Sequence, residues 1–191
     1  MIPRLKKIYL EEILPNIVKN LSIKNTMQAP KIKKIVLNMG LGLDASDSKV
    51  LKVIKEDLAN LTGQLPIVTK SKKAVANFKT RKDIPLGLKV TLRKNNMYYF
   101  LDRLINMALP RIKDFRGLNP DSFDKEANYS FGIKEHVIFP EVSFDKIEKL
   151  RGLDITVVTS TNNKEASKAL LDSFDFPFYK KGSNYCLLYT S

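Results

Sequence analysis

The sequence predicts an α+β fold, a mostly antiparallel sheet with helices packed on one face and the other face open. Segments with alternating apolar and polar residues, typical of half-buried strands, are interspersed with segments of helical apolar periodicity. They do not alternate at the spacing of crossover units, which disfavours a parallel sheet. At 191 residues and 43% hydrophobic content, the chain can bury the core of one domain, which we expect over residues 1–180.

Four segments have the periodicity of amphipathic helices. The first covers residues 3–21, and Pro15 should bend or split it, because proline removes a backbone N–H and crowds the preceding turn. The clearest helix follows Ser46 or Asp47, either of which can cap it, and ends before Gly63, which suits a left-handed C-terminal position. The remaining two helices are expected over residues 95–108 and 163–173.

Two segments alternate clearly enough to predict half-buried strands, residues 31–40 and 88–93. Successive side chains of a strand point to opposite faces, so both strands present a basic and polar outward face. The outward positions are Lys34, Val36, Asn38, Lys89, Thr91 and Arg93. Further strands are expected over residues 66–70, 129–133, 136–139 and 154–160.

The formal charge of +13 and the pI of about 9.7 predict a polyanionic partner. Residues 1–95 hold 20 Lys and Arg against 7 Asp and Glu, whereas residues 96–191 hold 13 of each. The whole excess therefore lies in the first half, which indicates one dedicated anion-binding face. A membrane surface also attracts basic patches, but we favour nucleic acid, and no apolar run is long enough to span a membrane.

The densest basic segment, residues 70–82, has six basic side chains and no acid. It lies between two expected strands and lacks a helical apolar stripe, so it should project from the core as a loop. Phe78 would then stack on a base or a sugar while lysines contact phosphates. The alternative is a solvated hairpin with Phe78 packed into the core.

The sequence contains little that supports catalysis, a metal or a cofactor. Met39-Gly40-Leu41-Gly42 lacks the lysine of a P-loop and the third glycine of a dinucleotide fingerprint. Cys186 and His136 are the only residues of their kinds, which disfavours a metal site, and we expect His136 on a strand or at the surface. Two rival classes stay open, an enzyme that binds phosphorylated ligands at Gly40 and Gly42, and a DNA-binding protein.

A series of motifs resembles one family of known proteins, the bacterial-type L five family of large-subunit ribosomal proteins. The match runs in order from about Leu5 to Lys180. Joined motifs of this length are far more specific than a single short pattern. They are Met27-Gln28-Ala29-Pro30, Leu37-Asn38-Met39-Gly40, Leu61-Thr62-Gly63-Gln64, Lys89-Val90-Thr91-Leu92-Arg93, Pro110-Arg111-Ile112-Lys113-Asp114-Phe115-Arg116-Gly117 and Asp175-Phe176-Pro177-Phe178.

The resemblance implies a non-enzymatic protein that binds 5S rRNA through the open sheet face and helps to attach it in the central protuberance. The residues implied to contact 5S rRNA are Lys34, Asn38, Gln64, Thr69, Lys89, Thr91 and Arg93. The projecting loop is implied to contact P-site tRNA through Lys72, Lys73, Asn77, Phe78, Lys79 and Arg81.

Further partners implied by the resemblance are other 5S rRNA-binding proteins and a small-subunit head protein, which residues 114–141 would face in an intersubunit bridge. Neither a membrane nor a small-molecule substrate is implied. We expect a ribosome-bound protein of the cytoplasm, with an organellar ribosome as the open alternative. The family pattern usually ends just after Asp175–Phe178, so residues 181–191 form a tail to which we assign no role.

Overall fold

The computed structural model describes residues 2–21, 25–113, 115–142 and 149–179. Within these residues five strands form one sheet in the order β2-β3-β1-β5-β4, and every pairing is antiparallel. The prediction of an α+β fold with a mostly antiparallel sheet is confirmed. The strands are β1 (Ile32–Gly40), β2 (Ile67–Lys70), β3 (Pro85–Leu92), β4 (Tyr129–Ile133) and β5 (Leu153–Thr159).

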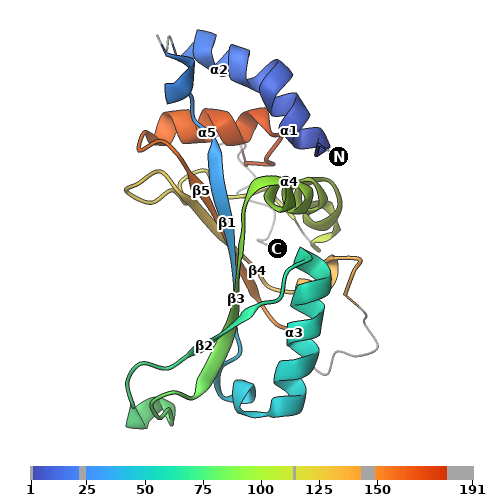
Figure 1. The fold of residues 1–191 in the computed structure, drawn as a ribbon, viewed down its shortest axis with the longest axis vertical. Coiled ribbons are helices and arrows are strands. Elements are labelled where there is room, and N and C mark those ends of the chain that lie inside the picture. Colours follow the sequence, from blue (N-terminus) through green and yellow to red (C-terminus); the bar gives the residue numbers. More distant parts are fainter. Residues whose placement is uncertain (1, 22–24, 114, 143–148, 180–191) are drawn as a thin grey trace, which may run out of the picture.

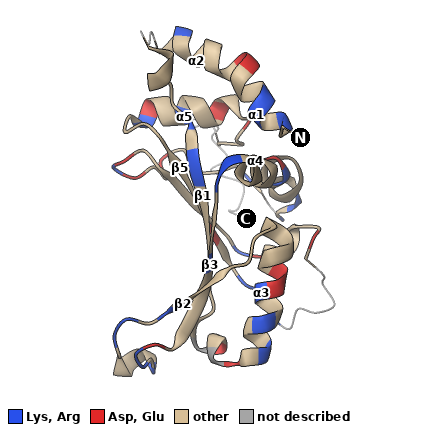
Figure 2. Cartoon of the chain, in the orientation of Figure 1, with Lys and Arg blue, Asp and Glu red and all other residues tan. Residues whose placement is uncertain are grey.

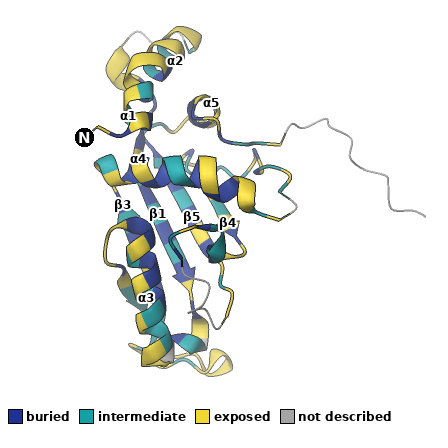
Figure 3. Cartoon of the chain, turned by 90° about the vertical axis from the view of Figure 1, so that its right-hand side faces the viewer, coloured by how far each residue is buried: buried dark blue, intermediate teal, exposed yellow. Residues whose placement is uncertain are grey.

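The helices are α1 (Arg4–Ile8), α2 (Leu14–Asn20), α3 (Ser48–Thr62), α4 (Lys94–Arg103) and α5 (Lys164–Ser173). Helices α3 and α4 lie on the same side of the sheet, and α1, α2 and α5 gather at the end where β1 begins (Figure 1). The sides of α3 and α4 that meet the sheet are buried and their outer sides are exposed (Figure 3). Among the described residues, no helix covers the opposite face of the sheet (Figure 1).

The first helical segment is interrupted, as Pro15 predicts. Between α1 and α2 the chain makes a π turn, Tyr9–Ile13, directly before the turn that contains Pro15. Such turns are a common cause of helix kinks. In this segment the side chain of Leu10 is 55% exposed, whereas that of Tyr9 is buried. The hydroxyl of Tyr9 donates to the Pro30 carbonyl oxygen at 3.0 Å, and burial raises the pKa of Tyr9 to about 12.

Strand β1 organises the core because it pairs on both sides. Ile35 lies opposite Leu92 of β3 and Val157 of β5, and these three side chains are fully buried. The next inward position, Leu37, lies in the same way between Val90 and Ile155. Apolar side chains thus form continuous rows across three strands, on the face that α3 and α4 cover.

The helix boundaries agree with the expected capping residues. The Asp47 side chain accepts a hydrogen bond from the Lys49 backbone N–H at 2.9 Å, at the start of α3. Gly63 follows α3 with φ of +67°, a left-handed conformation that glycine adopts without steric cost. Asn163 caps α5 through the Glu165 N–H. Helix α4 runs on through a π turn, Leu104–Ala108, and ends in a 3₁₀ turn that contains Pro110.

The prediction of a strand over residues 136–139 is wrong. His136–Ile138 form a 3₁₀ turn, in which the Phe139 N–H bonds back to the His136 carbonyl oxygen rather than to a neighbouring strand. His136 is buried, not at the surface, and its ring Nδ1 lies 3.1 Å from the Arg151 carbonyl oxygen and 3.3 Å from the Arg151 backbone nitrogen. Four residues are too few for the apolar pattern to distinguish a strand from a buried turn.

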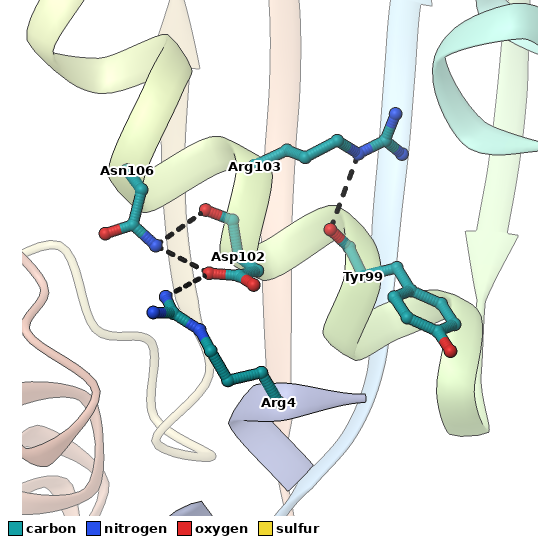
Figure 4. A network of polar contacts seen from close by, with 5 residues as sticks. All are labelled: Arg4, Tyr99, Asp102, Arg103 and Asn106. Atoms are coloured by element: carbon teal, nitrogen blue, oxygen red, sulfur yellow. Dashed lines mark hydrogen bonds and ion pairs between the residues drawn. The ribbon is translucent and has the colours of Figure 1, made fainter. Parts of the chain in front are cut away.

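Two arginines tie α4 to distant parts of the chain. Arg4 of α1 contacts the Asp102 carboxylate at 2.7 Å, and the Asn106 amide donates to the same oxygen at 2.6 Å (Figure 4). Arg103 donates to the Leu61 carbonyl oxygen at 2.7 Å and forms an ion pair with Glu141. The pair at Arg4 is largely exposed and contributes little, about 0–1 kcal/mol. Arg103 instead closes the end of α3, where carbonyl groups lack helical partners.

The close approach of β1 and β3 predicts a sharp difference between two glycines that face each other. A Cβ atom on Gly87 would lie 2.6 Å from the Met39 carbonyl oxygen, whereas a Cβ on Gly40 has nothing within 4 Å. Gly87→Ala should lower the free energy of unfolding by about 1–3 kcal/mol through overpacking. Gly40→Ala should change it by less than about 1 kcal/mol. Urea unfolding of both variants checks this, and equal losses would contradict it.

Candidate RNA-binding surfaces

The uncovered face of the sheet carries rows of polar side chains set by the strand register. Asn38 of β1 lies opposite Lys89 of β3 and Asp154 of β5. Two residues before Asn38 on the same strand, Val36 lies between Thr91 and Thr156. These positions alternate with the buried rows, so they point away from α3 and α4. We call this surface the open sheet face.

The structure brings most of the expected 5S rRNA contacts together on the open sheet face. Lys34, Asn38, Lys89 and Thr91 share it by alternation along β1 and β3. Thr69 joins them, because it pairs with Gly87, two residues before Lys89. The other two lie at its margins. Arg93 is exposed directly after β3, and Gln64 is exposed in the turn between α3 and β2.

The face also contains residues that the sequence analysis did not select. Asp154, Thr156 and Ser130 come from the neutral half of the chain, and the Ser130 and Thr156 hydroxyls lie 3.1 Å apart. The Asn38 amide donates to the Asp154 carboxylate at 3.4 Å. The alternation of residues 154–160 was a signal for the β5 positions, but nothing indicated that β5 pairs with β1. The face is therefore basic near β3 and neutral to acidic near β5.

A second basic surface is the loop between β2 and β3, residues 70–82, which we call the basic loop. It extends from the end of the sheet remote from α1, α2 and α5 (Figure 1), and Lys and Arg are spaced along it (Figure 2). Its tip contains a 3₁₀ turn, Ala76–Phe78, and the Phe78 side chain is 72% exposed. Phe78 does not pack into the core, so that alternative is wrong.

Hydrogen bonds brace the basic loop at its base and at its tip. Ser71 is buried, its N–H donates to the Ile84 carbonyl oxygen at 2.9 Å, and its hydroxyl donates to the Arg81 carbonyl oxygen. At the tip, Val75 and Thr80 exchange two backbone hydrogen bonds of 3.0 and 3.2 Å. The segment is thus a small hairpin of defined shape.

The turn at Gly40 and Gly42 does not form an anion cradle. Gly42 starts a 3₁₀ turn, Gly42–Ser46, whose Asp44 carboxylate lies 3.0 Å from both Lys149 and Arg151. Hydrogen bonds from Lys149 and Arg151 hold the pKa of Asp44 below its usual value. Both cations at this turn are paired with the Asp44 carboxylate, which disfavours the rival enzyme.

Two other classes of site are absent from the part of the chain that the structure describes. It holds no group of three or more His, Cys, Asp or Glu side chains placed to bind a metal ion. Nor does it contain a helix with the length and hydropathy needed to cross a bilayer.

Comparison with known proteins decides the family. Residues 25–81 match the model of ribosomal protein L5, and residues 85–178 match that of the ribosomal L5P family C-terminus. The chain belongs to the ribosomal protein L5 family. The two matched segments meet between residues 81 and 85, at the end of the basic loop, yet strands from both form one sheet, because β1 pairs with β3 and β5.

Relatives in the L5 family match the chain over nearly its whole length. The large ribosomal subunit protein uL5 of Pelagibacter ubique is 64% identical over 184 residues, which cover 96% of this chain and all of that protein. The uL5 proteins of Dichelobacter nodosus and Clostridium botulinum are each 52% identical, over 92% and 93% of this chain and 98% and 99% of their own lengths. These are structural proteins of the large ribosomal subunit, not enzymes.

The bracing at the base of the basic loop predicts how the loop responds to a protease. Ser71→Ala removes the bond to the Arg81 carbonyl oxygen, which costs about 0.5–1.5 kcal/mol and falls mainly on the local opening of the loop. Trypsin should therefore cleave the loop several-fold faster, as followed by mass spectrometry. Ser173→Ala, a change on α5 far from the loop, is the control. Unchanged cleavage in the Ser71 variant would show that the bond does not hold the loop.

Proposed function

We propose that this chain binds 5S rRNA with its open sheet face and helps to attach it in the central protuberance of the large ribosomal subunit. The observation that supports this most is the outward face of β1 and β3, where Lys34, Asn38, Lys89 and Thr91 gather without a covering helix. A face that presents cations and hydrogen-bonding side chains together suits a helical RNA. Membership of the L5 family supports the same assignment.

Each side-chain type on the face has a role in this binding. Lysine and arginine neutralise phosphates and release counterions. Asn38 and Thr91 donate and accept hydrogen bonds, which matches the 2′-hydroxyl groups that RNA displays in its shallow minor groove. The acidic residue of the row, Asp154, lies on the β5 side, so we place the phosphates over β3 and β1.

The basic loop is proposed to contact P-site tRNA. It reaches beyond the sheet, the cations proposed to make the contact are Lys72, Lys73, Lys79 and Arg81, and Asn77 and Phe78 lie at its tip. An exposed aromatic ring among cations is the combination that binds unpaired nucleotides by stacking and charge neutralisation. Other 5S rRNA-binding proteins, and a small-subunit head protein facing residues 114–141, complete the proposed set of partners. The tail, residues 181–191, and the domain boundary before it lie outside the described residues.

The division between the two surfaces can be tested with paired variants. Thr91→Ala with Arg93→Ala should weaken binding of isolated 5S rRNA by about tenfold or more, because a charged contact and a hydrogen bond are lost. Lys72→Gln with Lys73→Gln and Lys79→Gln should leave 5S rRNA affinity nearly unchanged and weaken tRNA binding. Filter binding of both RNAs measures this. Equal loss of 5S rRNA affinity in both variants would disprove the division.

Salt dependence tests whether phosphate contacts provide the affinity. If about five to ten phosphates are neutralised, log Kd for 5S rRNA should rise with log salt with a slope of about 4 to 9. Arg93→Ala alone should reduce that slope by about one, because one phosphate contact is removed. A slope near zero would rule out the open sheet face as a phosphate-binding surface. Double-stranded DNA, the ligand that a DNA-binding protein would prefer, should compete poorly with folded RNA for the chain.

A further inference from the structure

The basic loop borders an open hollow with partly apolar walls. A cavity of about 890 Å³ lies between the loop, Gly42 and the start of β3. This volume falls in the range of small-ligand sites, about 300–1,000 Å³. Its walls are apolar at Val75, Phe78 and Leu86. The remaining lining residues are Gly42, Ser71, Lys72, Lys73, Asn77, Lys79 and Thr80.

The lining combines two kinds of chemistry in one place. Apolar walls exclude water and favour a flat, weakly hydrated group, whereas Lys72, Lys73 and Lys79 favour anions next to it. No acidic residue lines the cavity. A nucleotide matches this arrangement, because its base is planar and apolar on its faces while its phosphates are negative.

The cavity is formed before any ligand arrives. The Ser71 bonds hold its base, the paired backbones of Val75 and Thr80 hold its rim, and Lys79, with φ of +52°, turns the chain at the tip. A preformed site avoids the entropy cost of ordering a loop upon binding.

We infer that this cavity takes one unstacked nucleobase of a folded RNA, with the flanking phosphates bound by the lysines at its mouth. The inference rests on the proposed contact of the basic loop with tRNA and extends it from charge attraction to a base-binding subsite. The occupant is a nucleotide within an RNA loop rather than a free nucleotide. Lysines on both strands of the hairpin can bind the phosphates on either side of the base.

The test compares an intact RNA with an RNA that lacks one base. The probes are tRNAs assembled from synthetic pieces, each with a single abasic position among the unpaired loop nucleotides, so that phosphate charge is unchanged. With the full chain, at least one abasic tRNA should bind about 5- to 100-fold more weakly than the intact tRNA, the range expected for loss of one stacked base. Equal affinity at every position overturns the inference.

Two variants connect the effect to the cavity. Val75→Trp fills the hollow from a position with extended backbone and should abolish the difference between intact and abasic tRNA. Leu65→Trp adds the same side chain at an exposed position outside the cavity and should keep it. If Val75→Trp unfolds the loop, as judged by trypsin cleavage, Phe78→Ala replaces it. This variant removes the aromatic wall of the cavity and should also abolish the difference between intact and abasic tRNA. A retained difference in the folded cavity variant overturns the inference.

The lysine variants separate this inference from the proposed function. Lys72→Gln with Lys73→Gln and Lys79→Gln should weaken intact and abasic tRNA by the same factor. If they weaken both but no abasic position matters, the loop binds tRNA by charge alone and only the base subsite fails. If they weaken neither, the tRNA contact itself fails. Displacement of the tRNA by millimolar adenosine monophosphate would assign the cavity to a free nucleotide and overturn the RNA assignment.

Discussion

The double pairing of β1 is the constraint on which the rest of the structure depends. Because β1 lies between β3 and β5, its inward residues Ile35 and Leu37 build the core, and its outward residues Lys34 and Asn38 build the open sheet face. A register slip of one residue would exchange these two sets. The same alternation therefore secures stability and the proposed RNA contacts, and neither can shift without the other.

The helices complete this separation by leaving one face uncovered. Helices α3 and α4 bury the inward rows, and Arg103 fixes their relative position by joining the Leu61 carbonyl oxygen and Glu141. The polar face is left to solvent or to a ligand. A net charge of +13 repels itself in the compact state, so neutralisation by a polyanion also stabilises the fold. In the proposed function, binding and folding are thus linked through the same cations.

Strand β3 connects the two proposed RNA surfaces. Lys89 and Thr91 lie on the open sheet face, and the basic loop enters the same strand at Pro85. The close contact of Gly87 with Met39 holds this part of β3 tightly against β1. The loop is also braced internally, so the cavity is held at a fixed position relative to the sheet. In the proposed function, two RNAs would be positioned relative to each other by one strand.

The sequence by itself determined the elements whose signals are local. The alternation around Ile35 and Leu37, the cap at Asp47, the left-handed Gly63 and the exposed Phe78 all follow from residues close together in the chain. These signals predicted the fold class, the basic half of the open sheet face and the projecting loop.

Only the tertiary structure decided which strands meet and which turns are buried. Asp154 reaches the face because β5 pairs with β1 across more than a hundred residues, and His136 lies in a buried turn because Arg151 supplies its backbone partners. The cavity beside the basic loop likewise needs Gly42 and Leu86 brought next to the loop. Side-chain period shows which face a residue occupies but not which strand lies next to it, and that choice depends on packing between distant segments.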